Sequence, residues 1–554
     1  METPVKVLGI NALFHDPSAA LVVDGRTVAA AEEERFSRRK HGHRPVPFAA
    51  WELPEKAAAW CLAEAGLDVA DLDAVTYSFD VALARPAEEL GLHDPWDHLR
   101  QAYAREAPGF LATALPGLDP AQVRFVAHHV AHAASSALAA PYVADGGGPT
   151  DVLVLDGRGE CASHLAGTYD EGRLTIHHTQ ELPHSLGLMY EELTEHLGFL
   201  RSSDEYKVMA MASYGEPRFL DELRRRVRAT DDGGFVTERI DWQALAKRVE
   251  PGQEWAPEHA DLAASVQTRL EEVLLELAGR LRERTGSRRL TLAGGVALNC
   301  VANTVLFERS GYDDVWVQPA AGDAGTALGG ALHVAAQAGD TLAPVTGADL
   351  GRGWSDEEIE GWLRTAQLPY ERPADVAAEV AECLAADGVV AWFQGRSEFG
   401  PRALGHRSLL AHPGRRENLE RLNDVKGREQ FRPVAPMVRA ERAGEIFSRG
   451  PLPSPYMLFV HDVAPAWRER IPAVVHVDGT ARVQTVDAAQ EPLVAQMLAE
   501  FEARTGLPVV VNTSLNTAGR PMVDDPRDAL ECFGSAPVSL LAIGPFVVRR
   551  RALA

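Results

Sequence analysis

The chain has 554 residues, of which 46% are hydrophobic and 24% charged, and its formal net charge at pH 7 is −24. This composition is typical of a globular protein with a sizeable core. So negative a charge repels phosphate backbones and anionic lipids, so we expect no nucleic-acid or membrane partner. The five scattered cysteines lack a CxxC motif, and the N-terminal residues lack the apolar run of a signal peptide. We therefore expect a cytoplasmic monomer or homodimer.

The first predicted elements are three strands joined by tight turns, at residues 5–10, 19–23 and 27–31. The same arrangement of strand, loop, strand, turn and strand returns at residues 151–176. In both copies a strand follows the first loop, whereas a dinucleotide-binding βαβ unit requires a helix there. The pattern favours a duplicated lobe of the actin, sugar-kinase and acetate-kinase type.

Apolar side chains at three- and four-residue spacing predict further helices. They lie at residues 54–66, 130–140, 261–285, 356–365, 376–386 and 491–505. Buried strands are predicted at residues 289–292, in GVVAWFQG and in VVVNTSLN. Pro, Gly and acidic residues accumulate near residues 336–375, which indicates a boundary. We expect a first domain at residues 1–345, a linker at 346–375 and a second domain at 376–554.

Two histidines are placed to bind one metal ion together. His128 and His132 are four residues apart on a predicted helix, so their imidazoles lie on one face. Asp156 and Asp323, which end apolar strands before glycine-rich loops, are candidates to complete the set. Two imidazoles and two carboxylates suit Fe²⁺, Zn²⁺ or Mn²⁺. The alternative is a helix whose histidines are solvated or belong to the core.

Glycine-rich turns follow three apolar strands of the first domain. Such turns let backbone N–H groups approach phosphate oxygens, which favours a nucleotide site, with tight structural turns as the alternative. The asparagines on the next helix are placed either to contact a ribose or base or to cap that helix. The candidate nucleotide-binding residues are Gly157, Gly159, Gly294, Gly295, Asn299 and Asn303.

The charge reverses between residues 396 and 432, where nine Lys and Arg residues stand against five Asp and Glu residues. The arginines lie beside chain-breaking residues and so belong to loops, which favours bidentate capture of small phosphates. A salt-bridged surface patch is the alternative. HVDGTARVQ and NTSLN supply further polar groups at strand ends, where ordinary turn chemistry is also possible. The candidate phosphate-binding residues are Arg396, Arg402, Arg407, Lys426, Arg428, Arg432, Arg482, Asn512 and Ser514.

The first loop contains His15 and Asp16. An imidazole can act as a general base near neutral pH, and a carboxylate can orient it. Adjacent loop residues rarely face the same point, so a dyad is not assumed, and the residues alone favour a structural role for His15.

The order of the motifs resembles one enzyme family over nearly the whole chain. The resemblance is carried by HDPSAAL, EEERFSRRKH, HHVAHAAS, LDGRGE, GGVALN, QPAAGDAG, FGPRALGHRS, KGREQFRPVAP, HVDGTARVQTV and NTSLN. These resemble the ATP-dependent O-carbamoyltransferases of antibiotic and nodulation-factor biosynthesis, of the tobramycin, cephamycin, novobiocin and geldanamycin type. The resemblance implies a two-lobed α/β fold, with an N-terminal duplicated actin/sugar-kinase-like (RNase H-like) domain and a C-terminal YrdC-like domain.

The resemblance also implies a reaction and its residues. The second domain would form carbamoyl adenylate from carbamoyl phosphate and ATP, with Mg²⁺, and the first would transfer the carbamoyl group to a natural-product hydroxyl. His15 is expected to be the general base, with Asp16 as the weaker candidate. A divalent ion, Fe²⁺ by preference and otherwise Zn²⁺ or Mn²⁺, is expected on His128, His132, Asp156 and Asp323.

Two other classes of protein share parts of this pattern. An ATP-dependent phosphotransferase of the actin/sugar-kinase superfamily would release ADP, whereas adenylation releases pyrophosphate and then AMP. A nucleotide-switched binding protein would leave the cations of the second domain unexplained. The sequence leaves the acceptor scaffold open.

Overall fold

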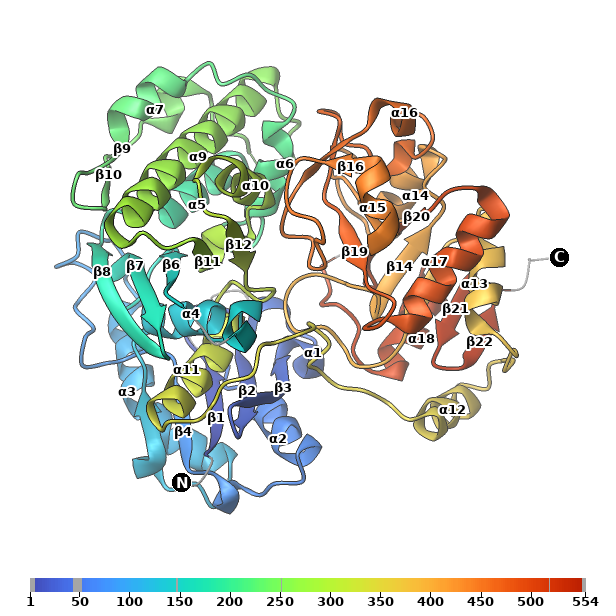
Figure 1. Ribbon diagram of the computed structural model, residues 1–554, viewed down its shortest axis with the longest axis horizontal. Coiled ribbons are helices and arrows are strands. Elements are labelled where there is room, and N and C mark those ends of the chain that lie inside the picture. Colours follow the sequence, from blue (N-terminus) through green and yellow to red (C-terminus); the bar gives the residue numbers. More distant parts are fainter. Residues whose placement is uncertain (1–4, 43–51, 146–147, 251, 518, 551–554) are drawn as a thin grey trace. The chain divides into compact units, whose positions relative to one another are not determined.

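The computed structural model describes residues 5–42, 52–145, 148–250, 252–517 and 519–550 (Figure 1). The chain divides into two compact units, unit 1 up to Thr346 and unit 2 from Gly347. The assignment of residues 346–375 to a separate linker is therefore corrected, because nearly all of these residues belong to unit 2. Within that segment Glu371 forms a β-bridge with Val547. Arg352 Nε also donates to Asp524 Oδ2 at 2.7 Å.

Unit 1 contains two five-stranded sheets of the same design, with the orders β3-β2-β1-β4-β5 and β8-β7-β6-β11-β12. In each sheet three consecutive strands, β1–β3 or β6–β8, pair antiparallel with one another. The other two strands, β4 and β5 or β11 and β12, extend the sheet on the far side of β1 or β6 and run parallel to it. The strands are β1 (Lys6–Asn11), β2 (Ser18–Val23), β3 (Arg26–Glu32), β4 (Ala74–Tyr77), β5 (Val123–Phe125), β6 (Thr150–Leu155), β7 (Ala162–Asp170), β8 (Arg173–Glu181), β11 (Arg289–Ala293) and β12 (Asp314–Val317). The predicted duplication is confirmed.

A pair of helices joins the two sheets of unit 1. α11 (Ala324–Gln337) packs on β1 and β2, α4 (His128–Ala137) packs on β6 and β11, and the two helices pack on each other. The approach is close because Gly329 of α11 lies against the α4 backbone, where a Cβ would come within 1.8 Å of Ala131 O. This contact fixes the start of each helix relative to the other.

The remaining elements of unit 1 surround these sheets (Figure 1). They are α1 (Glu34–Ser37), α2 (Glu55–Glu64), α3 (Asp97–Ala114), α5 (Leu186–His196), α6 (Glu205–Ala212), α7 (Leu220–Arg226), β9 (Val227–Ala229), β10 (Phe235–Thr237), α8 (Trp242–Leu245), α9 (Pro257–Thr285) and α10 (Cys300–Arg309).

Unit 2 is built on one mixed sheet of seven strands, in the order β19-β15-β20-β14-β13-β21-β22, with a smaller sheet β16-β17-β18. Its strands are β13 (Val390–Phe393), β14 (Arg407–Ala411), β15 (Ala435–Arg439), β16 (Phe447–Ser448), β17 (His461–Val463), β18 (Thr480–Ala481), β19 (Gln484–Val486), β20 (Val509–Ser514), β21 (Leu540–Ile543) and β22 (Phe546–Arg549). Its helices are α12 (Asp356–Thr365), α13 (Val376–Ala385), α14 (Glu417–Val425), α15 (Ala440–Ile446), α16 (Pro465–Arg468), α17 (Pro492–Thr505) and α18 (Pro526–Ser535).

The α/β class is confirmed for both units. The main apolar cluster of unit 2 includes the fully buried Trp392 and Phe501. In the part of the chain that the structure describes, no helix combines the length and apolar character needed to cross a membrane.

The close contact between α4 and α11 predicts that Gly329→Ala is destabilising. The added methyl group meets backbone and not a flexible side chain, so we expect the free energy of unfolding to fall by about 1–3 kcal/mol. Gly279→Ala in α9 is the matched control, because nothing lies within 4 Å of its Cβ position. There the lost freedom of the unfolded chain should stabilise the protein by about 0.4–1 kcal/mol. Urea denaturation followed by circular dichroism measures both values, and equal values would contradict the prediction.

Candidate functional site

Four buried side chains of unit 1 converge on one point. His128 and His132 lie on the first turns of α4, Asp156 follows β6, and Asp323 precedes α11. His128 Nε2 lies 3.3 Å from Asp156 Oδ2 and 3.7 Å from Asp323 Oδ1. His132 Nε2 lies 3.8 Å and 3.5 Å from the same two oxygens. One ligand atom from each residue lies within 4.8 Å of all the others. The structure thus brings together the four predicted ligands, which we call the His/Asp cluster.

The His/Asp cluster has the donor set and the unmet hydrogen-bonding capacity of a cation site. Both ring nitrogens of His132 and both carboxylate oxygens of Asp323 are buried without a hydrogen-bond partner among the described residues. Buried polar atoms in folded proteins are normally satisfied. Two imidazoles and two carboxylates together fit a divalent transition-metal ion.

The charges within the cluster are strongly coupled. Burial disfavours the imidazolium of His128, but its hydrogen bond to Asp156 and the charge of Asp323 outweigh burial and raise its pKa to about 9. Burial alone would raise the pKa of Asp156, yet the hydrogen bond from His128 and the nearby His132 hold it well below its usual value. Asp156 therefore stays ionised.

A glycine turn holds the carboxylate of Asp156 in place. Gly295 N–H donates to Asp156 Oδ1 at 2.9 Å. The preceding Gly294 has a φ of 91°, and a Cβ there would lie 2.2 Å from Leu155 O. Only glycine fits this position. The Gly294-Gly295 turn therefore orients a predicted metal ligand, whereas its predicted contact with a nucleotide stays a prediction.

Glu160 fixes the start of α4 and was not predicted. Its Oε1 accepts the backbone N–H of His128 at 2.8 Å and that of Asp80 at 2.7 Å. The residue before α4, Ala127, offers no capping side chain, so Glu160 supplies the missing acceptor from a distant loop. Burial raises the pKa of Glu160. His128 Nδ1 contacts Ser78 O at 3.2 Å, which sets the orientation of its ring.

His15 lies beside the His/Asp cluster on a strained loop. Its neighbours Phe14 and Asp16 have φ values of 61° and 50°, a left-handed conformation that side chains rarely adopt and that is common at functional sites. This geometry brings His15 Nε2 to 3.7 Å from Asp323 Oδ2.

Asp16 is held between two histidines. Its Oδ2 lies 3.0 Å from His15 Nδ1 and its Oδ1 lies 2.7 Å from His41 Nδ1. Burial would raise the pKa of Asp16, but the two imidazoles lower it well below its usual value. Adjacent loop residues rarely face the same point, but here the side chains of His15 and Asp16 contact each other. The geometry gives Asp16 an orienting position, and His41 is a neighbour that sequence reasoning missed although its motif was noted.

The other predicted nucleotide residues of unit 1 contact their own chain. Asn299 accepts the N–H of Ala302 at 3.1 Å, so it caps α10, and its amide also pairs with Gln267. Asn303 Nδ2 donates to Ala297 O at 2.8 Å. Gly159 packs against His129, where a Cβ would come within 2.9 Å of the ring. Gly157, in the same loop as Gly159, lies beside the side chain of Glu191 on α5.

Several of the predicted groups of unit 2 meet at the end of β20. Lys426 Nζ donates to Ser514 O at 2.5 Å and to Ser514 Oγ at 3.0 Å, and it also contacts Asn516. Asn512 lies two residues before Ser514 on the same face of β20, and its Nδ2 donates to Gln484 Oε1 at 2.7 Å. Asn512 Oδ1 and Arg482 Nε are buried without a hydrogen-bond partner among the described residues. These two atoms therefore have unused hydrogen-bonding capacity.

The predicted arginines of unit 2 differ in their surroundings. Arg407 is fully buried, donates to Gln394 O at 2.8 Å and to Arg352 O at 2.9 Å, and lies 3.7 Å above the Phe393 ring. The phosphate-binding role predicted for Arg407 does not fit these surroundings. Arg396 Nε likewise donates to Gly351 O at 2.8 Å.

The other three arginines lie on loops and at a helix end. Arg402 is partly buried in the loop before β14. Arg428 Nε contacts Asn423 Oδ1, after the end of α14. Arg432 Nη1 lies 3.5 Å from Glu429.

The loop before β14 is shaped by a carboxylate that sequence reasoning missed. Buried Glu398 accepts backbone N–H groups through Oε1, from Leu404 at 2.6 Å, His406 at 3.0 Å and Arg407 at 3.3 Å. Three such bonds to one oxygen fold the chain tightly around it. In the sequence, Glu398 is visible as an acidic residue inside the cationic segment 396–432.

Comparisons with known proteins cover both units. The family described as Carbamoyltransferase N-terminus matches residues 6–112 and 96–332, and the family described as Carbamoyltransferase C-terminus matches residues 381–550. An uncharacterized protein of Synechocystis is 35% identical over 99% of this chain and 97% of its own length. The nodulation protein NolNO of Sinorhizobium fredii is 36% identical over 98% of this chain and 80% of its own. HypF of T. kodakarensis is 14% identical over 62% of this chain and 50% of its own, with a TM-score of 0.33.

The fold and the site define a two-unit α/β enzyme with a duplicated first unit and a buried His/Asp cluster. The chain belongs to the carbamoyltransferase family. Its activity is therefore carbamoyl transfer.

The position of Glu160 predicts that Glu160→Ala is destabilising. The buried N–H of His128 and the partly buried N–H of Asp80 lose their acceptor, so we expect the free energy of unfolding to fall by about 2 kcal/mol. Glu160→Gln keeps an acceptor oxygen and should lose less than half as much. Exposed Glu106 on α3 provides the control, since Glu106→Ala should change stability by less than about 0.5 kcal/mol. Urea denaturation tests this, and an unaltered midpoint in Glu160→Ala would refute it.

Proposed function

We propose that this protein is an ATP-dependent O-carbamoyltransferase that forms carbamoyl adenylate in unit 2 and carbamoylates a hydroxyl of a natural product in unit 1. The observation that carries the proposal is that His15 lies next to the four side chains of the His/Asp cluster in unit 1. Unit 2 adds arginines on loops and buried polar atoms of Arg482 and Asn512 without a hydrogen-bond partner among the described residues.

The proposed first step activates a poor acyl donor. Carbamoyl phosphate and water give carbamate and phosphate, and the carbamate oxygen then attacks the α-phosphorus of ATP and displaces pyrophosphate. The product, carbamoyl adenylate, has AMP as a good leaving group. Phosphate-rich substrates require cations and N–H donors, which supports roles for Arg402, Arg428, Arg432, Arg482 and the polar end of β20. Mg²⁺ is expected to accompany ATP.

The proposed second step takes place in unit 1. The acceptor hydroxyl oxygen attacks the carbamoyl carbon, the bond to AMP breaks, and the hydroxyl proton passes to a base. The role of His15 as this base is supported by its geometry, because Asp16 binds its Nδ1 and leaves Nε2 3.7 Å from Asp323 Oδ2 in the cluster. His128, His132, Asp156 and Asp323 would hold a divalent ion, Fe²⁺ by preference and otherwise Zn²⁺ or Mn²⁺. When bound, such an ion would polarise a carbonyl or neutralise a phosphate.

The decisive experiment supplies ATP, Mg²⁺ and ¹⁴C-labelled carbamoyl phosphate without an acceptor. The proposal expects labelled carbamoyl adenylate and pyrophosphate by mass spectrometry and chromatography. Formation of ADP in place of pyrophosphate would support a phosphotransferase and overturn the proposal.

Loss of one cluster ligand should separate the two steps. His132→Ala is expected to remove stoichiometric metal, because a buried imidazole ligand typically contributes orders of magnitude in metal affinity. Carbamoyl adenylate should still form, since unit 2 is unchanged. Metal is measured by elemental analysis, and His333→Ala, a histidine outside the cluster, is the control. Full metal content in His132→Ala would contradict the metal assignment.

Loss of one loop arginine should stop the first step. Arg432→Ala is expected to reduce pyrophosphate–ATP exchange driven by carbamoyl phosphate at least tenfold, because about 1.4 kcal/mol of lost binding already gives that factor. Arg416 lies in the same cationic segment but is exposed, so Arg416→Ala should exchange normally. Equal exchange rates in the two variants would contradict the assignment of Arg432 to the phosphate-binding site.

A further inference from the structure

Unit 2 contains a second group of side chains of the kinds that bind metal ions, formed by Asp349, His406 and Glu491. One ligand atom from each of the three lies within 4.8 Å of the others. His406 directly precedes β14, Glu491 directly precedes α17, and Asp349 lies in the segment before α12. We call this group the unit 2 triad. It shares no residue with the His/Asp cluster, which belongs to unit 1.

The closest contact of the unit 2 triad has the spacing of two ligands of one ion. His406 Nε2 lies 3.0 Å from Glu491 Oε1. Bonds of about 2.1 Å that meet at about 90–110° place two ligand atoms about 3.0–3.4 Å apart. An ordinary hydrogen bond has the same length, so the charge and the unmet bonding capacity of the group must distinguish the two.

The carboxylates around His406 outnumber the cations that pair with them. Burial would lower the pKa of His406, but its hydrogen bond to Glu491 and the charges of Glu398, Glu491 and Asp349 raise it. None of these three carboxylates forms an ion pair with a Lys or Arg in the part of the chain that the structure describes. A proton on His406 would balance one negative charge, and a divalent cation would balance the other two.

Two buried atoms beside these charges lack hydrogen-bond partners among the described residues. His406 is 8% exposed, and its Nδ1 is one of them. Glu398 is 1% exposed, and its Oε2 is the other, although its Oε1 accepts three backbone N–H groups. Buried polar atoms are normally satisfied. These two atoms therefore indicate a ligand that the described residues do not supply.

Two glycines leave room next to atoms of the unit 2 triad. A Cβ on Gly347 would come within 2.3 Å of Asp349 Oδ1, and a Cβ on Gly395 would come within 3.1 Å of His406 Nδ1. A larger residue at either position would crowd a metal-binding atom. Glycine at both positions keeps these atoms clear of side chains.

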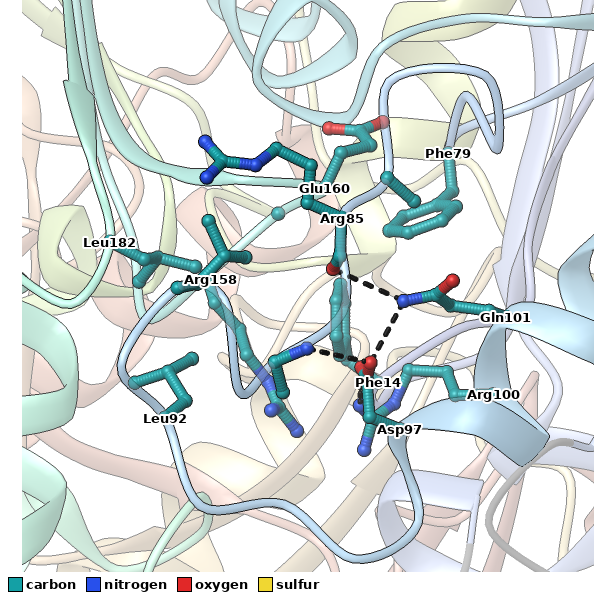
Figure 2. A pocket seen from close by; sticks show the side chains of 14 residues that line it. Phe14, Phe79, Arg85, Leu92, Asp97, Arg100, Gln101, Arg158, Glu160 and Leu182 are labelled. Carbon is teal, nitrogen blue, oxygen red and sulfur yellow. Dashed lines mark hydrogen bonds and ion pairs between the residues drawn. The ribbon is translucent and has the colours of Figure 1, made fainter.

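A carboxylate of unit 1 shows the ordinary alternative. Asp97, in the pocket of Figure 2, accepts at Oδ1 from Arg100 Nη1 at 3.2 Å, and at Oδ2 from Gln101 Nε2 at 2.8 Å and the Ala87 N–H at 3.0 Å. Both of its oxygens have donors and its charge faces a guanidinium, so it needs no further ligand. The unit 2 triad has no guanidinium partner among the described residues.

We propose that Asp349, His406 and Glu491 bind a divalent transition-metal ion of the Zn²⁺ or Mn²⁺ class. One imidazole with two carboxylates favours such an ion over Mg²⁺ and Ca²⁺, which take oxygen ligands. Glu398 adds a negative charge beside the site. The three ligands come from the protein, so binding requires neither ATP nor carbamoyl phosphate. The inference therefore goes beyond the proposed function and does not depend on it.

Metal titration of the full-length chain tests the site. The protein is freed of metal with a chelator, and Zn²⁺ binding is measured by isothermal titration calorimetry without any substrate, with Mg²⁺ as the comparison. His132→Ala, which lacks a ligand of the His/Asp cluster, should still bind one Zn²⁺ per chain and bind it more tightly than Mg²⁺. Absence of Zn²⁺ binding in His132→Ala, or tighter binding of Mg²⁺, would overturn the inference.

Further variants locate the ion. In the His132→Ala chain, Glu491→Gln should weaken Zn²⁺ binding at least tenfold and His406→Leu should abolish it, because each change removes a ligand. Glu500→Gln is the matched control, since it makes the same change on α17 at a carboxylate paired with Arg504. Zn²⁺ binding in this control should equal that of His132→Ala alone. Unchanged binding in Glu491→Gln would overturn the site.

Two safeguards keep the test open if a variant does not fold. Glu491 is partly exposed, so Glu491→Gln decides the site if His406→Leu fails. The same changes in the wild-type chain should each weaken or remove one Zn²⁺ per chain, which replaces the His132→Ala measurement. A wild-type chain that loses its last Zn²⁺ with Glu491→Gln would leave the unit 2 site standing while the metal of the His/Asp cluster fails.

Discussion

Burial of two carboxylates and two imidazoles at one point of unit 1 is the constraint on which the rest of that unit depends. Ionised carboxylates are costly to remove from water unless they are paired or bind a cation. Here they are paired incompletely, because the atoms of His132 and Asp323 that face the cluster have no hydrogen bond. The surrounding structure must therefore hold four side chains together although several of their polar atoms lack hydrogen-bond partners among the described residues.

The duplicated fold holds these four side chains in place. Asp156 leaves the end of a central strand of the second sheet, and His128 and Asp323 stand at the starts of the two helices that join the sheets. A tight glycine contact between α4 and α11 fixes these starts, and Glu160 ties the first N–H of α4 to the loop after β6. The positions of the four side chains thus follow from helices and strands, which hold side chains more precisely than loops do.

The cationic segment of unit 2 serves two purposes. Part of its charge is internal, since Arg407 and Arg396 donate to backbone carbonyls and hold the loop that Glu398 folds. Arg402, Arg428 and Arg432, which are also predicted to bind phosphate, are only partly buried, on loops and after the end of α14. A count of charges in sequence does not separate these uses, because a buried guanidinium and a ligand-binding one have the same residue type.

The sequence by itself determined the elements, the duplication, the His128–His132 pair and the family resemblance, because strand alternation, helical spacing and motif order are local or linear properties. Only the tertiary structure decided which distant groups meet. It placed Glu160 at a helix start that has no capping residue of its own, put Asp16 between His15 and His41, buried Arg407, and attached the expected linker to unit 2. Each of these depends on contacts between segments far apart in the chain, whose burial and partners no local pattern encodes.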